Sequence, residues 1–292
     1  MVYRRSGRSG ILLPAISLGL WHNFGGVDPL ENSRAILRRA FDLGITHIDL
    51  ANNYGPPYGS AEQTFGRALK LDLAPYRDEL IVSTKAGYDM WPGPYGNWGS
   101  RKYLLASLDQ SLARMGLEYV DIFYHHRPDP ETPLEETIKA FEKLKQDGKI
   151  RAYGVSNFDV ADLEEAVRLA GPENIACNQV LYNLKERSIE TGVLPWCAGR
   201  GISVVAYSPL STGELADAPE LREIALTHNV TTAQVALSFL VRHKRVFAIP
   251  KSADSHRVIE NLGAGLLELT PHDIERIEKA FPVEKKVGLP MA

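Results

Sequence analysis

The sequence predicts an α/β fold in which eight parallel strands close into a (β/α)8 TIM barrel. Short β-like runs alternate with stretches of helical period along the whole chain, and this alternation is typical of a parallel sheet. Eight such units in 292 residues favour a closed barrel over an open doubly wound sheet. No Gly-x-Gly-x-x-Gly motif follows the first strand, which disfavours a Rossmann domain. Because no Pro/Ser-rich linker interrupts the alternation, we expect one domain over residues 1–292.

The expected elements begin with a β-hairpin formed by residues 3–5 and 11–14 around a Gly-rich turn. The eight barrel strands follow in order. They are predicted at residues 16–18, 46–49, 80–84, 120–124, 152–156, 176–180, 204–207 and 246–249.

Several helix boundaries are also predicted. Residues 60–63 (Ser-Ala-Glu-Gln) and 132–135 (Thr-Pro-Leu-Glu) match capping boxes, the second with Pro133 at the first helical position. Gly148 is expected to end the helix at 134–147 in a left-handed conformation. After Ser100 an apolar stripe with helical spacing predicts a helix that packs on the sheet: Leu104, Leu108, Leu112 and Met115.

Composition limits the classes of partner. The chain is 44% hydrophobic and 24% charged, which is enough for a large buried core. A net charge of −3 argues against nucleic acid and anionic membranes as partners. The charged N-terminus has no apolar segment after it and no apolar run reaches the ~20 residues of a membrane helix, so we expect a cytoplasmic protein. Cys177 and Cys197 have no metal-like spacing, so no metal is expected and both thiols are expected to be reduced.

Four titratable residues fall where consecutive predicted strands end. Asp49 ends the second strand, with Tyr54 in the loop beyond it, Lys85 follows the third strand, and His126 follows the fourth. The C-terminal ends of barrel strands meet at one face, so these side chains should converge. A phenol with a pKa near 10 donates a proton poorly unless a cation stabilises its phenolate. Lys85, held by Asp49, could do this, and His126 could orient a carbonyl, so the set predicts carbonyl reduction.

These residues and the motifs around them resemble the aldo-keto reductase superfamily. The motifs span nearly the whole chain and occur in the family's order: residues 48–49, 53–55, 83–85, 121–126, 154–158, 207–210 and 249–252, with Arg257, Glu260 and Asn261. The resemblance implies a TIM barrel that binds NADPH without a Rossmann fold and transfers hydride to an aldehyde or ketone. It assigns the catalytic tetrad to Asp49, Tyr54, Lys85 and His126. His126 is preferred to His125 because the family's histidine lies five residues after the strand-four aspartate.

The resemblance also implies a cofactor site. Ser156, Asn157 and Gln179 would hold the nicotinamide carboxamide, and Tyr207 would stack on the ring. The remaining cofactor contacts would be Ser208, Leu210, Ser211 and Gly213 along the pyrophosphate, Lys251, Ser252 and Arg257 at the 2′-phosphate, and Glu260 and Asn261 at the adenine.

The substrate side of the site is expected in two aromatic loops. Trp21, Trp91 and Trp98 could wall an apolar pocket, although aromatic loops can equally cap the top of a barrel. Arg127 or Arg101 could meet a substrate phosphate, or Arg127 could form a surface ion pair. The sequence does not name the substrate, and methylglyoxal and glyceraldehyde phosphate are the candidates.

The two halves of the chain resemble different branches of the superfamily. Residues 19–25 and 88–101 resemble the bacterial glyceraldehyde-phosphate reductases, which are relatives of potassium channel β subunits. From about residue 174 onward the chain resembles diketogluconate-reductase-type members, with a short connection after the seventh strand. We therefore expect a recombined or designed chimera with a half-barrel junction near residues 155–175, and a divergent natural chain would show the same pattern. The short connection predicts a monomer and easy cofactor exchange.

Three other functions compete with carbonyl reduction. A nucleotide-binding redox-sensing subunit is suggested by the channel relatives, and the short connection after strand seven argues against it. A lyase using Lys85 as a Schiff-base nucleophile leaves Tyr207 and the Lys251–Arg257 cluster unexplained. A metal hydrolase built on His125 and His126 is disfavoured because adjacent strand residues point to opposite faces.

Overall fold

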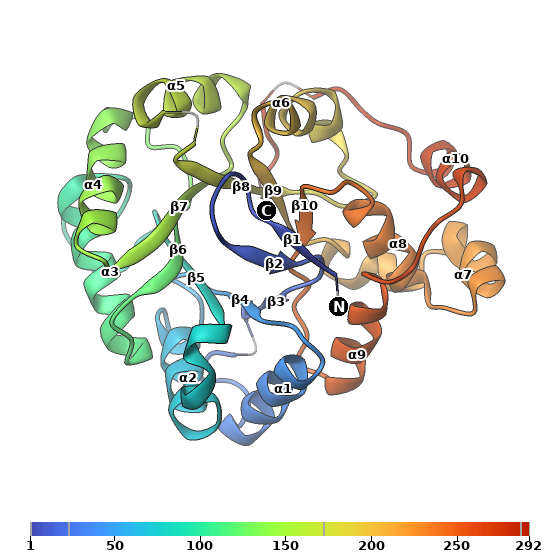
Figure 1. The fold of residues 1–292 in the computed structure, drawn as a ribbon, viewed down its shortest axis with the longest axis horizontal. Helices are drawn as coiled ribbons and strands as arrows, with labels where there is room; N and C mark the ends of the chain where they lie inside the picture. Colours follow the sequence, from blue (N-terminus) through green and yellow to red (C-terminus); the bar gives the residue numbers. More distant parts are fainter. Residues whose placement is uncertain (1, 23, 172, 287, 292) are drawn as a thin grey trace.

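The structure, a computed structural model that describes residues 2–22, 24–171, 173–286 and 288–291, is built around a parallel eight-stranded sheet. Each strand pairs with the next strand in sequence, from β3 to β10 (Figure 1). Parallel bridges join Ile16 to Ala248 and Gly19 to Lys251, so the first and last strands also meet. The (β/α)8 barrel is therefore confirmed. Its strands are β3 (Leu18–Gly19), β4 (His47–Asp49), β5 (Ile81–Ala86), β6 (Val120–His125), β7 (Ile150–Ser156), β8 (Ile175–Leu181), β9 (Ser203–Tyr207) and β10 (Val246–Ala248).

All eight predicted strands are confirmed, with shifts of one or two residues at their ends. The helices form a ring outside them (Figure 1). The ring contains α1 (Leu30–Asp42), α2 (Ser60–Ala68), α3 (Arg101–Met115), α4 (Leu134–Gln146), α5 (Val160–Ala170), α6 (Val193–Arg200), α8 (Thr232–Val241) and α9 (Ser255–Gly263). Two further helices, α7 (Arg222–His228) and α10 (Pro271–Ala280), lie outside the ring. Short helical turns are η1 (Leu69–Leu73), η2 (Ala74–Glu79), η3 (Ser188–Thr191), η4 (Ser211–Asp217) and η5 (Pro219–Leu221).

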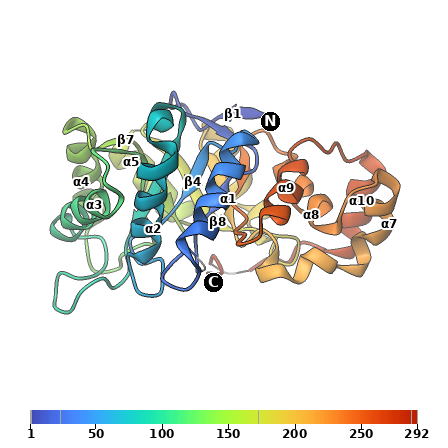
Figure 2. The same ribbon diagram turned by 90° about the horizontal axis from the view of Figure 1, so that it is seen from below.

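The predicted hairpin covers the end of the barrel at which the strands begin. Strands β1 (Tyr3–Arg5) and β2 (Leu12–Pro14) pair antiparallel, and they lie across the barrel mouth in Figure 1 and along one end of the barrel in Figure 2. Leu13 joins a buried cluster with barrel residues that include Tyr124 and Phe247. Gly7, at φ 59°, approaches the sheet so closely that a Cβ would lie 2.5 Å from the Ala176 carbonyl oxygen. This end is closed, so the opposite end is the one open to ligands.

The predicted starts and ends of the helices are partly confirmed. Ser100 caps α3 by accepting a hydrogen bond from the Tyr103 amide, and the predicted apolar stripe of that helix is buried. Gly148 adopts the expected left-handed conformation after α4, with φ 75°. Both capping boxes were wrong. Gly59 and Pro133 occupy the N-cap positions, and neither helix has a side-chain cap.

The physical reason is a displacement of one residue at each helix start: Ser60 lies inside α2, and Thr132 lies one residue before the N-cap of α4. Glu62 is fully buried, accepting from Thr84 Oγ1 at 2.6 Å and pairing with Arg114 Nε at 2.7 Å. Glu135 pairs with Lys139 at 2.6 Å along the helix. A side chain displaced by one residue does not meet the backbone amides that a capping box requires.

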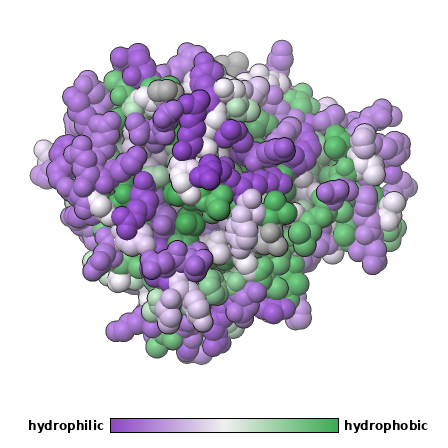
Figure 3. Space-filling view, viewed as in Figure 1, coloured by the Kyte–Doolittle hydropathy of each residue, from purple (hydrophilic) through white to green (hydrophobic). Residues whose placement is uncertain are grey.

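Polar and apolar side chains are interspersed on the surface that carries the hairpin (Figure 3). Both cysteines are buried and unpaired. Taken singly, no helix in the described ranges has the length and apolar character to cross a membrane. The helical stretches Pro219–His228 and Thr232–Val241, bent by 89°, match those criteria only when joined.

Candidate active site

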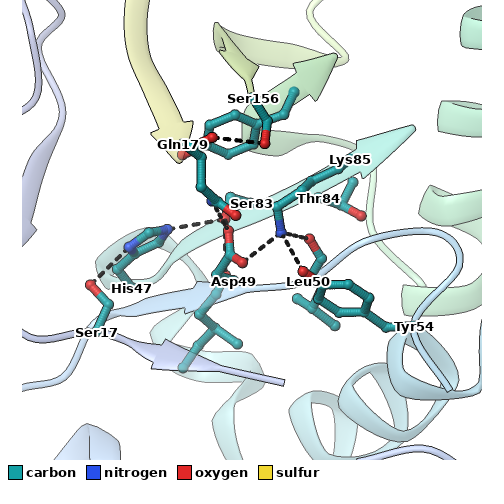
Figure 4. Close-up of polar contacts among 12 residues, drawn as sticks. Ser17, His47, Asp49, Leu50, Tyr54, Ser83, Thr84, Lys85, Ser156 and Gln179 are labelled. Atoms are coloured by element: carbon teal, nitrogen blue, oxygen red, sulfur yellow. Dashed lines mark hydrogen bonds and ion pairs between the residues drawn. The ribbon is translucent and has the colours of Figure 1, made fainter. Parts of the chain in front are cut away.

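The ammonium group of Lys85 is the centre of the site. Lys85 lies in β5 and is fully buried. Its Nζ donates to Asp49 Oδ2 at 2.6 Å, to the Leu50 carbonyl at 2.7 Å and to Tyr54 Oη at 3.1 Å (Figure 4). All three ammonium protons have acceptors, which is what a buried cation requires. Lys85, Asp49 and Tyr54, predicted from three separate positions, are thus brought together.

Asp49, in β4, is held from several strands. Its Oδ1 accepts from Ser83 Oγ at 2.7 Å and from Gln179 Nε2 at 3.0 Å. His47 lies between Ser17 Oγ at 2.9 Å and Ser83 Oγ at 3.0 Å. Because Ser83 gives its proton to the carboxylate, it must accept from His47 Nε2–H, and His47 Nδ1 then accepts from Ser17. A chain of hydrogen bonds, all oriented toward Asp49, therefore fixes the carboxylate (Figure 4).

The environment keeps the proton on Tyr54 at neutral pH. Burial raises the pKa of the Tyr54 phenol, and the nearby Lys85 cation opposes that rise without cancelling it. Burial alone would lower the pKa of Lys85, but Asp49 and Tyr54 raise it above its ordinary value. A protonated phenol beside a permanent ammonium group is a proton donor whose phenolate product is stabilised.

His126 follows β6, near Tyr54. Its amide donates to the Ala86 carbonyl at 2.9 Å, and its carbonyl accepts from Asn157 Nδ2 at 3.1 Å. Its ring centroid lies 6.2 Å from that of Tyr54. Burial, and then the Lys85 cation, holds the pKa of the His126 imidazole well below 6.5. The ring is therefore neutral at neutral pH, and its Nδ1 has no hydrogen-bond partner in the described part of the chain.

His125 points into a different environment. It belongs to β6, is buried, and packs against Phe158 with ring centroids 5.8 Å apart. Burial lowers the pKa of His125 to about 4. Within the described ranges, no three His, Cys, Asp or Glu side chains are grouped in a way that could hold a metal ion.

A cavity of about 640 Å³ opens above these residues at the C-terminal end of the barrel. Its lining brings together most of the predicted site. The predicted residues in the lining are Trp21, Asp49, Tyr54, His126, Ser156, Asn157, Gln179, Tyr207, Ser208, Leu210, Gly213, Lys251, Arg257, Glu260 and Asn261. A second cavity, of about 430 Å³, is lined by residues such as Leu194 and Arg245 and contains none of the predicted site residues.

Polar groups of adjacent strands are linked within the first cavity. Ser156 Oγ donates to the Gln179 carbonyl at 2.9 Å, and Asn157 Nδ2 donates to Ser156 Oγ at 3.2 Å. Tyr207 Oη donates to Asn157 Oδ1 at 3.0 Å. Asn157 itself has φ 61°, a conformation that asparagine tolerates better than most residues. These bonds fix an amide and two hydroxyl groups on one wall.

Besides the fully buried Lys85, four predicted residues lie outside the cavity lining, and their contacts explain why. Ser211 Oγ donates to Glu214 Oε2 at 3.1 Å, and Ser252 is buried, with its Oγ donating to the Asp254 carbonyl at 2.9 Å. Trp91 packs on Tyr103 with ring centroids 5.3 Å apart. Trp98 stacks on the Arg127 guanidinium, 3.8 Å from Cζ to the ring centroid. The expectation that Trp91 and Trp98 wall the pocket therefore does not match their positions.

Sequence reasoning missed several residues of the lining, including His22, Asn53, Tyr88, Thr212 and Asp217. Each of them lies in a loop that contains a predicted residue. Position in a loop after a barrel strand is therefore the sequence feature that could have identified them. Asn23, next to His22, lies outside the described residues.

Comparison with known proteins adds three findings. The model of the Aldo/keto reductase family matches residues 15–281. The chain is 48% identical over 307 residues to L-glyceraldehyde 3-phosphate reductase of Escherichia coli O157:H7, covering 92% of this chain and 89% of the relative. It is 36% identical over 288 residues to methylglyoxal reductase YeaE of Escherichia coli K12, covering 96% of each. An aldo-keto reductase of Klebsiella pneumoniae, solved in complex with NADPH, matches all of both chains with a TM-score of 0.88 and 32% identity.

Proposed function

The chain belongs to the aldo/keto reductase family, and on that basis we propose how its own residues carry out the reaction. It is an enzyme that reduces aldehydes or ketones to alcohols with NADPH. The roles of individual residues and the identity of the substrate are the parts that we propose.

The residues of the cavity fit NADPH, which supplies the hydride when bound. Ser156, Asn157 and Gln179 offer donors and acceptors suited to a carboxamide, and Tyr207 offers a ring face beside them. Lys251 and Arg257 line the cavity and suit a phosphate. We assign the remaining contacts as the family resemblance implies: Ser208, Leu210, Ser211 and Gly213 to the pyrophosphate, Ser252 to the 2′-phosphate, and Glu260 and Asn261 to the adenine.

The proton comes from Tyr54 in this proposal. The observation that supports it is the 3.1 Å contact between Lys85 Nζ and Tyr54 Oη at the base of the cavity. The substrate carbonyl oxygen accepts the phenolic proton, and Lys85, held by Asp49, stabilises the phenolate that remains. His126, neutral and facing the cavity, orients the carbonyl by a hydrogen bond.

The substrate is a small carbonyl compound, and we propose 2-oxo aldehydes such as methylglyoxal together with glyceraldehyde 3-phosphate. The support is that the two relatives are an L-glyceraldehyde 3-phosphate reductase and a methylglyoxal reductase. Trp21 and His22 would form one wall of the substrate end, because both line the cavity and their rings lie 3.8 Å apart.

Steady-state oxidation of NADPH tests this function. Each aldehyde should cause NADPH loss equal to the alcohol formed, and NADH should support a lower kcat/KM. Lys251→Met should remove part of that preference, because it removes a cation from the site proposed for the 2′-phosphate. Tight NADPH binding without turnover of either aldehyde would instead favour the redox-sensing alternative.

We also propose that the chain is a single barrel domain over residues 1–292, recombined or designed from two branches of the family, with the junction near residues 155–175. The support is that residues 19–25 and 88–101 resemble one branch, whereas the residues from about 174 onward resemble the other. Separate phylogenies of residues 1–155 and 160–292 test the idea. One shared nearest branch for both halves would contradict it.

We further propose a cytoplasmic monomer that binds neither nucleic acid nor membranes. A net charge of −3 and two buried, unpaired cysteines support this. Light scattering should give the mass of one chain, 32.4 kDa, and a multiple of that mass would contradict the monomer.

A further inference from the structure

A guanidinium group lies close to two aromatic rings beside the active site. Arg127 Cζ lies 3.8 Å from the ring centroid of Trp98 and 4.2 Å from that of Tyr88. The two rings come from one loop, between β5 and α3, whereas Arg127 follows β6. This arrangement joins the aromatic loop to the strand end that carries His126.

Hydrogen bonds fix the guanidinium in that position. Arg127 Nε donates to the Gly87 carbonyl at 3.0 Å, and Nη2 donates to Asn97 Oδ1 at 3.1 Å. Asn97 Oδ1 also accepts from the Trp98 amide at 2.7 Å. Arg127 is absent from the described lining of the cavity. Its guanidinium group thus contacts two rings and forms two hydrogen bonds, which suits a structural contact better than a ligand contact.

Tyr88 also contacts the ring of His126. The Tyr88 ring meets the His126 ring edge-on, with centroids 4.7 Å apart at 88°. The His126 ring has no hydrogen bond that would set its orientation in the described structure, and Nδ1 is buried without a partner. Packing against Tyr88 on one side and Tyr54 at 6.2 Å is therefore what orients the ring.

We propose that Trp98, Arg127 and Tyr88 form a stacked column that positions His126 for the substrate carbonyl. Arg127 is then a positioning residue, and it does not bind a substrate phosphate. This inference rests on the role proposed for His126. It also gives the aromatic loop a function that does not require its tryptophans to touch the substrate.

The charged groups around His126 favour the neutral form of its ring. Three cationic or potentially cationic groups face His126: Lys85 from β5, His125 from β6 and Arg127. After burial, these three groups in that order lower the pKa of His126, with Lys85 and Arg127 charged at neutral pH. The phenols of Tyr54 and Tyr88 complete its surroundings. The column therefore also helps to keep the imidazole neutral.

Kinetics with two substrates separate positioning from phosphate binding. Arg127→Met should lower kcat/KM roughly 10- to 100-fold for methylglyoxal and for glyceraldehyde 3-phosphate alike, mainly through kcat. Trp98→Leu should act in the same direction, and Trp98→Phe, which retains a ring, should recover most of the activity. Lys102→Met is the matched control, because it removes a similar contact, 3.9 Å from Nζ to the Tyr95 ring, near the same loop.

Two kinetic results would overturn the proposal. A rise in KM confined to the phosphorylated aldehyde would make Arg127 a phosphate ligand. Activity of Arg127→Met equal to that of Lys102→Met would show that the column does not position His126.

Nuclear magnetic resonance of the histidine rings tests the column without turnover. In Arg127→Met the His126 ring signals should shift and its pKa should rise, whereas Lys102→Met should leave both unchanged. Unchanged His126 signals in a folded Arg127→Met protein would contradict the column. If the parent enzyme proved inactive, the proposed function would fail, but this measurement would still decide whether the column orients the ring.

Discussion

At the level of single residues, Lys85 sets the chemistry of the site because it is a fully buried cation with three acceptors. The sequence predicted its partners Asp49 and Tyr54, since side chains at the ends of neighbouring barrel strands must converge. It did not predict the contribution of His47 or Ser83. Their roles depend on strand register, which aligns Asp49 with Ser83, and on which face of each strand points inward.

The ionisation states predict a flat pH profile. The phenol of Tyr54 has its pKa above 10, and the imidazole of His126 has its pKa well below 6.5. The donor is protonated and the histidine neutral throughout that interval, so kcat/KM for methylglyoxal should vary little across it. Activity should fall only as the pH rises above 10, where Tyr54 loses its proton. An inflection near 6.5 would contradict the neutral His126.

Ser83→Ala should destabilise the protein by about 1–3 kcal/mol, because buried partners lose a hydrogen bond. Asp49 Oδ1 loses one donor and His47 Nε2 loses its acceptor. Urea unfolding measures the change. Ser60→Ala is the control, because its Oγ is buried without a partner and does not cap α2, so this variant should be neutral or slightly stabilising.

At the level of elements, the strands were predictable and the loops were not. Runs of β-branched and other apolar residues predict buried strands because parallel barrel strands are covered on both faces. The capping boxes failed because a short motif does not fix the exact residue at which a helix starts: the N-caps are Gly59 and Pro133, one residue away from Ser60 and Thr132. The positions of Trp91 and Trp98 depend on loop packing against Tyr103 and Arg127, which no periodicity encodes.

The end of β5 must approach the end of β6 closely. A Cβ at Gly87 would lie 2.9 Å from His126 Cβ and 3.4 Å from the Arg127 amide nitrogen. Gly87→Ala should therefore displace His126, lowering kcat and costing about 1–3 kcal/mol of stability through overpacking. Activity assays and urea unfolding measure both effects. Gly10→Ala, where nothing lies within 4 Å of the added Cβ, is the matched control, and equal behaviour of the two variants would contradict the close approach.

At the level of the whole molecule, the barrel closes by bridges from Ile16 and Gly19 to the last strand and its extension, and it is sealed at one end by the hairpin. Alternation of strand and helix predicted this architecture along the entire chain. The two additional helices, α7 and α10, were not anticipated, because they add no strand and leave the count of β/α units unchanged.

Buried histidines predict a loss of stability in mild acid. Burial lowers the pKa of His47 and His125 to about 4, whereas the unfolded chain protonates each near 6.5. Between these values unfolding takes up protons, so the free energy of unfolding should fall as the pH drops from 6.5 toward 4, by up to roughly 3 kcal/mol for each ring. Urea unfolding over this range measures it. His47→Gln should flatten the slope, and an equally steep slope would contradict the assignment to His47.

The most direct test of the account is NADPH oxidation with methylglyoxal by Tyr54→Phe, with NADPH binding measured in parallel. The proposed mechanism predicts at least a ~100-fold loss of kcat with cofactor affinity unchanged, because the hydroxyl group that donates the proton is removed. Tyr76→Phe, at an exposed tyrosine that packs on Phe41, should behave like the parent enzyme. If Tyr54→Phe reduced methylglyoxal at the parent rate, the proton would come from elsewhere, and the role assigned to the Lys85–Tyr54 pair would be wrong.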